Sequence, residues 1–194
     1  MENKRRQYEK IFLGAVLVLV GLVSGCDQFK EVSINEGLLN DYLLKRVHYQ
    51  KQIILSGAAK ANITLGDLTS QVGRKDPEKI ELSTQAKVQL ATLLGSIQAD
   101  MKLTIRAKPI FDAEKGAIFI KGLEIVDYQT TPEKVATPIK ALIPYLNTSL
   151  SEFFDTHPVY VLNPEKSKAE AAASKLAKGL EIKPGKLVIG LADK

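Results

Sequence analysis

Thiol chemistry is the first possibility that the sequence raises, because the chain has a single cysteine, Cys26, directly after Val23-Ser24-Gly25. A thiol at such a position can be alkylated by a diacylglyceryl group before the preceding leader is cut. Ahead of it lie a basic stretch at residues 4–10 and an uncharged apolar segment at residues 11–23. This layout is typical of a bacterial secretory signal that ends in a lipobox. We therefore expect residues 1–25 to be removed and Cys26 to carry the lipid.

Two other interpretations of the leader are a membrane-spanning helix and a plain secretory signal with a chance cysteine. A spanning helix needs about 20 apolar residues, and this run has 13 before Ser24. Arg5-Arg6 resembles a twin-arginine signal, but the rest of that pattern is poor and the general secretory route is favoured. A protein with two or three acyl chains at its N-terminus is held firmly on a membrane without spanning it.

The residues after Cys26 indicate in which bacterial membrane the lipidated protein stays. Asp27 followed by Gln28 is similar to the signal that keeps lipoproteins on the inner membrane of enteric-type bacteria. We expect the periplasmic face of the inner membrane in preference to the outer membrane. Residues 26–32 then form a lipidated N-terminus and short tether, and residues 33–194 form a single periplasmic domain.

The composition of the chain from Cys26 onward sets further limits. Removal of the leader lowers the net charge from +5 to +3, so the domain is mildly basic. The lysines between Lys166 and Lys194 are interspersed with acids, which favours a solvated surface over a patch for anionic lipid. No aromatic-rich basic motif accompanies them, which argues against nucleic acid. Because Cys26 is used for the anchor, the domain has no thiol left for a disulfide.

Residues that could support catalysis or bind a metal are sparse. His48 and His157 have no cysteine or second histidine at metal-ligand spacing, so we expect structural or surface roles for both. The loop 112–116 has two alternating acids but lacks the further ligands of a calcium loop, so a hairpin turn is expected there. Nucleophile-elbow and phosphate-loop motifs are absent. The sequence therefore indicates neither an enzyme nor a cofactor.

Periodicity predicts the elements of the first two thirds of the chain. Ser33 and Glu36 have capping-box spacing, and a helix is expected over residues 33–47. Strands are expected over 61–68, 80–90, 97–107 and 117–128, of which the second and third alternate between apolar and polar residues. Long strands with one apolar face are typical of an antiparallel sheet that is covered on one side.

The last third should supply that cover. A stripe of apolar residues predicts a long amphipathic helix over 131–154, with Pro132 in its first turn and a kink at Pro144. A short strand at 158–162, an alanine-rich helix that opens at Asn163-Pro164 and closes at 178–179, and a hairpin of 180–182 with 187–191 follow. The fold class is therefore α+β, with helices added at both ends of the domain.

Several ordered stretches together resemble the YceB-like lipoproteins, an uncharacterised bacterial family. The stretches are Leu68-Thr69-Ser70-Gln71-Val72-Gly73-Arg74, Phe111-Asp112-Ala113-Glu114-Lys115-Gly116-Ala117-Ile118-Phe119, Thr131-Pro132-Glu133-Lys134, Leu142-Ile143-Pro144-Tyr145-Leu146-Asn147, Tyr160-Val161-Leu162 and Lys175-Leu176-Ala177-Lys178-Gly179. The resemblance implies a strongly curved antiparallel sheet wrapped around the long helix, similar to one half of the tubular lipid-binding domains of bactericidal/permeability-increasing protein. It implies no catalytic residues.

Two hypotheses for function follow. In the first, the sheet and the long helix hold an acyl chain or other apolar ligand. The residues expected to line that site are Leu82, Val88, Leu90, Met101, Leu103, Ile105, Ile139, Ile143, Leu146, Leu150 and Phe153. In the second, these residues simply pack together, and the domain is a structural or partner-binding lipoprotein of the cell envelope that acts through its surface, for example through Arg74-Lys75 or the lysine-rich C-terminal third.

Overall fold

The computed structural model describes residues 30–55, 59–93 and 95–192. The expected leader, the lipidation residue Cys26 and the sorting residues Asp27 and Gln28 lie outside these ranges. Within them, no helix is both long enough and apolar enough to cross a membrane.

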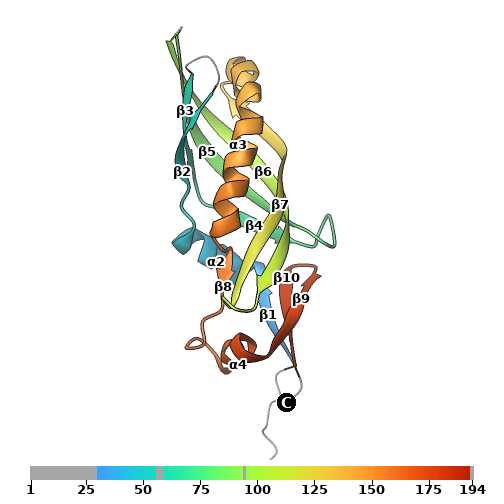
Figure 1. Ribbon diagram of the computed structural model, residues 1–194. Coiled ribbons are helices and arrows are strands. Elements are labelled where there is room, and N and C mark those ends of the chain that lie inside the picture. Colours follow the sequence, from blue (N-terminus) through green and yellow to red (C-terminus); the bar gives the residue numbers. More distant parts are fainter. Residues whose placement is uncertain (1–29, 56–58, 94, 193–194) are drawn as a thin grey trace, which may run out of the picture.

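Two antiparallel sheets and three α-helices make up the described part of the chain (Figure 1). In chain order the elements are β1 (Glu31–Asn35), α2 (Glu36–Arg46), β2 (Gln50–Ile54), β3 (Lys60–Leu65), β4 (Thr69–Val72), β5 (Ile80–Thr92), β6 (Gly95–Asp112), β7 (Ala117–Thr131), the 3₁₀ turn η3 (Glu133–Val135), α3 (Ala136–Thr156), β8 (Tyr160–Val161), α4 (Lys168–Leu176), β9 (Ala177–Lys183) and β10 (Lys186–Leu191). The larger sheet has the order β2-β3-β5-β6-β7-β8, with β4 also paired to β5, and the smaller has the order β1-β10-β9. The predicted α+β class is confirmed.

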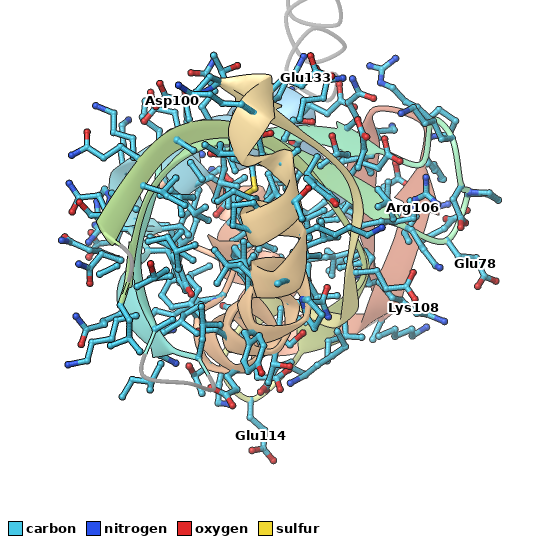
Figure 2. The ribbon with its side chains drawn as sticks, turned by 90° about the horizontal axis from the view of Figure 1, so that it is seen from above. Glu78, Asp100, Arg106, Lys108, Glu114 and Glu133 are labelled. Atoms are coloured by element: carbon cyan, nitrogen blue, oxygen red, sulfur yellow. The ribbon has the colours of Figure 1, made fainter. Side chains whose placement is uncertain are left out.

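The larger sheet has one apolar and one polar face, as the alternation predicted. On β5 and β6, residues such as Leu82, Val88, Met101 and Leu103 are buried, while Lys87, Lys102 and their polar neighbours are exposed. The helix α3 lies along the apolar face (Figure 1). Seen from above, strands lie behind α3 and to its sides, and the labelled side chains of Glu78, Lys108 and Glu114 point outward (Figure 2).

The long helix begins later than predicted. Thr131 is the last residue of β7, the Thr131–Pro132 peptide is cis, and the turn η3 precedes α3, which begins at Ala136. Pro132 therefore caps the 3₁₀ turn and does not lie in the first turn of the α-helix. Pro144 lies inside α3, which continues through it to Thr156. At 1.5 Å per residue the helix is about 32 Å long, enough to follow most of the sheet.

The N-terminal helix is shorter than predicted because its first residues belong to a sheet. Glu31–Asn35 form β1, which pairs with β10, so residues 31 and 32 of the expected tether are part of the fold. The N-cap of α2 is Asn35, whose Oδ1 accepts from the Leu38 amide at 2.9 Å, and not Ser33. The capping-box pattern was misleading because Ser33 lies in a strand and pairs with Val188, near the other end of the chain. A local sequence pattern does not contain information about such a distant pairing.

Other boundaries also differ from the prediction. The strands β2 and β4 were not predicted, and the predicted strand 61–68 ends at Leu65. The alanine-rich helix is confined to α4, since residues 177–179 start β9 and Gly179 pairs with Gly190 instead of ending a helix. The predicted C-terminal hairpin is confirmed as β9 and β10.

The helix α2 joins the two sheets through side chains that bind the edge of β4. Glu36 Oε1 accepts from the Val72 amide and from Arg74 Nε, each at 2.8 Å, and Glu36 Oε2 accepts from Arg74 Nη2 at 2.7 Å. Asn40 Oδ1 accepts from the amide of Ser70 at 2.8 Å. The hydrogen bond from Arg74 is the largest cause that lowers the pKa of Glu36, so this carboxylate stays ionised at neutral pH. The polar edge of β4 is thereby satisfied by α2.

Gly73 lies at the same junction and contacts the hairpin of the smaller sheet. Its φ of +58° is left-handed, and a Cβ atom there would lie 3.0 Å from Ile182 Cγ2 and 3.3 Å from the Lys183 carbonyl oxygen. Glycine is therefore required both by backbone conformation and by the close approach of β9.

We predict that Gly73→Ala lowers the free energy of unfolding by about 2 kcal/mol, because a left-handed alanine is strained by roughly 1–2 kcal/mol and the contact adds to that. Gly179→Ala is the matched control: it has no neighbour within 4 Å and no positive φ, so a change within about 0.5 kcal/mol is expected. Urea unfolding with a constant m-value measures both. Equal stability of the two variants would contradict the proposed junction.

Candidate functional site

The residues expected to line a ligand site lie together in the core. Leu82, Val88 and Leu90 are on β5, Met101, Leu103 and Ile105 on β6, and Ile139, Ile143, Leu146, Leu150 and Phe153 on α3. Nine of them are at most 3% exposed, and the other two, Ile143 and Phe153, are half-buried against the same cluster. The structure thus brings all eleven to the space between sheet and helix, where they pack against one another.

The helix α3 lies between the two sides of the larger sheet and is attached to β7. Asn147 Oδ1 accepts from the Ile125 amide at 2.9 Å, and Asn147 Nδ2 donates to the Leu123 carbonyl at 3.3 Å. Lys121 of β7 also pairs with Asp155 of the helix. Because β7 pairs with β8 only at residues 117 and 118, Asn147 satisfies backbone groups on an edge of β7 that β8 does not reach.

The opposite side of α3 meets β2 at fewer points. The Tyr49 hydroxyl, just before β2, donates to Ser149 Oγ at 2.9 Å, and both side chains are buried. Burial is the main cause that raises the pKa of Tyr49, so this phenol stays a donor at neutral pH. The Tyr49 ring meets Phe153 edge-on at 5.3 Å, and Lys51 pairs with Glu152 at 3.3 Å in an exposed position.

Beyond these contacts a groove of about 520 Å³ separates β2 from α3. One wall is Lys51–Ile54 of β2, and the other consists of Pro144, Tyr145 and the following turns of α3 to Glu152. Ile54 is 70% exposed and Tyr145 is 41% exposed, so apolar surface faces solvent here. We call this the β2–α3 groove.

The β2–α3 groove was missed from sequence because β2 was missed. Val47, Tyr49 and Ile53 are buried at two-residue spacing, interrupted by the exposed Lys51. That alternation is the signal that could have predicted a half-buried strand. Only Ile53 of this strand reaches the core, so the signal is weak.

The sequence analysis also considered residues that could bind a metal or take part in catalysis, and the structure places them in local contacts. His157 stacks on Phe153 at 4.0 Å, and its Nδ1 lies 2.9 Å from the Phe153 carbonyl. Loop 112–116 is the hairpin turn between β6 and β7, where Asp112 Oδ1 accepts from the Lys115 amide. Within the described ranges no group of three or more His, Cys, Asp or Glu side chains is placed to hold a metal ion.

Arg74 and Lys75, considered above for partner recruitment, take part in ion pairs of the fold. Arg74 binds Glu36, and Lys75 Nζ lies 2.8 Å from Glu81 Oε2. Arg106 Nη2 binds the other oxygen of Glu81 at 2.6 Å, which leaves Glu81 only 7% exposed on the outer face of β5. Burial disfavours the Glu81 carboxylate, but the bonds from Lys75 and Arg106 outweigh it and lower its pKa.

Comparison with known proteins adds family information to this geometry. A family model described as "Protein of unknown function (DUF1439)" matches residues 34–186. The chain is 46% identical over 181 residues to "Uncharacterized lipoprotein YceB" of Salmonella typhimurium, covering 93% of this chain and 97% of that protein. It is 45% identical over 184 residues to the protein of the same name in Escherichia coli, covering 95% and 99%. The resemblance inferred from short stretches is confirmed.

Among solved structures, a crystal structure of lipopolysaccharide binding protein aligns with 83% of this chain at 11% identity and a TM-score of 0.31. The chain spans about half the length of that protein, 49%. At this score the likeness carries no argument about fold or ligand.

Proposed function

Because the chain belongs to the DUF1439 family and its relatives carry the name lipoprotein, we propose that it is a lipid-anchored protein of the bacterial envelope that binds an acyl chain or similar apolar ligand in the β2–α3 groove. The proposed anchor is a diacylglyceryl group on Cys26, and the proposed location is the periplasmic face of the inner membrane. The role is binding without chemical conversion.

The observation that carries this proposal is the β2–α3 groove itself. Its volume of about 520 Å³ lies within the range of about 300–1,000 Å³ that is usual for small-ligand sites. Ile53, Ile54, Pro144 and Tyr145 provide apolar surface along it. Covering such surface with an acyl chain is favourable by about 25 cal/mol per Å².

The contacts between β2 and α3 support the same site. The strand β2 is hydrogen-bonded to β3 alone and ends the larger sheet. The Tyr49–Ser149 hydrogen bond and the Lys51–Glu152 pair cross this side, and an exposed ion pair contributes at most about 1 kcal/mol. Separation of β2 from α3 would admit a chain toward Phe153, a half-buried residue of the predicted lining whose ring meets Tyr49 on this side of the helix.

The alternative is a structural or partner-binding envelope lipoprotein. The tight burial of the other nine predicted lining residues favours it, because a filled core needs no ligand. In this alternative the β2–α3 groove holds no lipid, and the protein binds its partner through the outer surface. The ligand experiment below separates the two.

The first prediction of this section concerns the anchor. Cys26→Ser removes the thiol that would be alkylated, so the variant should lose incorporation of a labelled fatty-acid analogue. Metabolic labelling followed by immunoprecipitation measures this. Ser33→Ala, on the exposed face of β1, is the control and should keep the label. Label that persists in Cys26→Ser would refute lipidation at this residue.

The second prediction concerns sorting. If Asp27 retains the protein on the inner membrane, Asp27→Ser should move it to the outer membrane, because the residue after the lipidated cysteine is what the sorting machinery reads in enteric-type bacteria. Sucrose-gradient fractionation of the two membranes measures the distribution. Wild-type protein in the outer-membrane fraction would reverse the assignment.

The third prediction concerns the ligand. Thr148 is exposed and lines the β2–α3 groove, so Thr148→Trp should fill the groove without overpacking the core. Membranes that contain a phospholipid with a photoactivatable acyl chain are irradiated, and adducts are mapped by mass spectrometry. We expect adducts on the β2 segment 50–55 and on α3 residues 144–152, reduced at least about fivefold in Thr148→Trp.

Lys140→Trp is the matched control for this experiment, because Lys140 is an exposed residue of α3 that does not line the groove. It should keep wild-type adducts, and both variants should unfold within about 1 kcal/mol of wild type, as expected of surface substitutions. Absence of adducts in the two segments, or an equal loss in both variants, would favour the packed, partner-binding alternative.

A further inference from the structure

A second groove, remote from the β2–α3 groove, lies between α2 and the segment that follows α3. Its volume is about 630 Å³. Leu38, Asp41, Tyr42, Lys45 and Arg46 form its α2 wall, at the spacing of neighbours on one helix face. The facing wall is residues 160–163, from β8 onward, together with Lys166. We call it the α2–β8 groove.

The charged side chains of the α2–β8 groove are mainly cationic. Lys45, Arg46 and Lys166 line it, and Asp41 is its single lining carboxylate in the described part of the chain. Lys45 and Arg46 are exposed and form no salt bridge with any residue of the described ranges. Both cations lie in the last turn of α2, and Asp41 precedes Lys45 by four residues on the same helix. With Lys166 the charged lining is still net positive and attracts an anion, and the planar fork of arginine suits the oxygens of a phosphate or carboxylate.

An aromatic pair forms the floor between these cations. The Tyr42 and Tyr160 rings are 5.5 Å apart at an angle of 46°. The Tyr160 hydroxyl donates to Glu170 Oε1 at 3.1 Å, and Lys166 Nζ donates to the same hydroxyl at 3.3 Å while lying 5.8 Å from the ring centroid. Tyr160 is 3% exposed and supports the half-buried Tyr42 ring. The organic part of a ligand would lie against Tyr42, while its anionic part meets the cations.

A buried carboxylate holds this floor in place. Glu170 is 5% exposed, and its Oε2 accepts from the Asn163 amide at 2.7 Å. Lys166 Nζ lies 3.8 Å from Glu170 Oε1. Burial, with the charge and hydrogen bond of Glu170, raises the pKa of Tyr160, so the phenol stays neutral and adds no charge to the groove. Tyr160 and Lys166 are therefore positioned before any ligand arrives, which lowers the entropic cost of binding.

The α2–β8 groove lies in the half of the molecule that contains β1, β10 and α4 (Figure 1). The Leu191 amide donates to the Lys30 carbonyl at 2.9 Å, which fixes the start of the described chain at this end. Cys26 is four residues before Lys30, so a chain of at most about 14 Å joins them. If Cys26 is lipidated, this end of the domain lies near the membrane.

We propose that the α2–β8 groove binds a phosphate ester of a small polyol, with Lys45, Arg46 and Lys166 around the phosphate and the Tyr42 ring against the polyol. The ester comes either from the headgroup of an anionic phospholipid or from a free sugar phosphate. This site is separate from the acyl-chain groove, and its test uses different residues and probes.

The test uses the full chain as cells process it, extracted from membranes in an uncharged detergent. In one arm, glucose 1-phosphate and glycerol 1-phosphate are titrated by calorimetry. In the other arm, the protein is placed in nanodiscs of phosphatidylcholine, with or without phosphatidylglycerol, and the reaction of its lysines with an amine reagent is quantified by mass spectrometry. Lys87 and Lys102, exposed on the far face of β5 and β6, are the internal reference.

Either of two results supports the proposal. The first result is that a soluble ester binds, and that its binding weakens at least about tenfold in Lys45→Glu/Arg46→Glu. In the charge-matched control Lys87→Glu/Lys102→Glu the binding should weaken less than about twofold. This result identifies a free ester as the ligand. The second result is that the amine reagent modifies Lys45 and Lys166 at least about threefold less when phosphatidylglycerol is present. In the double variant Lys45→Glu/Arg46→Glu, Lys166 should lose this protection. This result identifies the lipid headgroup as the ligand. No soluble binding together with unchanged lysine reactivity overturns the proposal. Equal effects of the two charge reversals also overturn it, because they mean non-specific attraction.

Discussion

The apolar inner face of the larger sheet is the constraint on which the rest of the fold depends. Leu82, Met101 and Leu103 point inward from the long strands β5 and β6 and are fully buried. Leaving such a face in water would cost more than the few kcal/mol by which domains are stable. The helix α3 must therefore cover it. Because Asn147 ties α3 to β7, the space that remains opens on the other side, at β2.

Patterns that extend over ten or more residues predicted the structure well, and short or non-local ones did not. The strands β5 and β6 and most of α3 were predicted because their apolar periodicity extends over many residues. The strand β1 was assigned in part to a helix because Ser33 and Glu36 imitate a capping box, whereas pairing with β10 decides the conformation. Glu36 instead binds Arg74 and the Val72 amide, a role that depends on residues far along the chain.

The candidate site was predictable in part for the same reason. The eleven predicted lining residues do lie between sheet and helix, since amphipathic faces must meet. The β2–α3 groove depends on a short strand with a single core residue, and that signal is weak. The α2–β8 groove joins Lys45 and Arg46 to Tyr160 and Lys166 from a distant part of the sequence, and only the folded topology makes them neighbours.

The helix side chains that bind strand edges also affect self-association. Exposed sheet edges are templates on which other copies can pair and aggregate, and anchoring on a surface raises the local concentration of copies. Asn40 and Glu36 occupy backbone groups of β4, and Asn147 does so on β7. At the two ends of the sheet, β8 is two residues long and β2 carries Lys51. The edges left for strand exchange between neighbours are those of β2 and, in the smaller sheet, of β1 and β9.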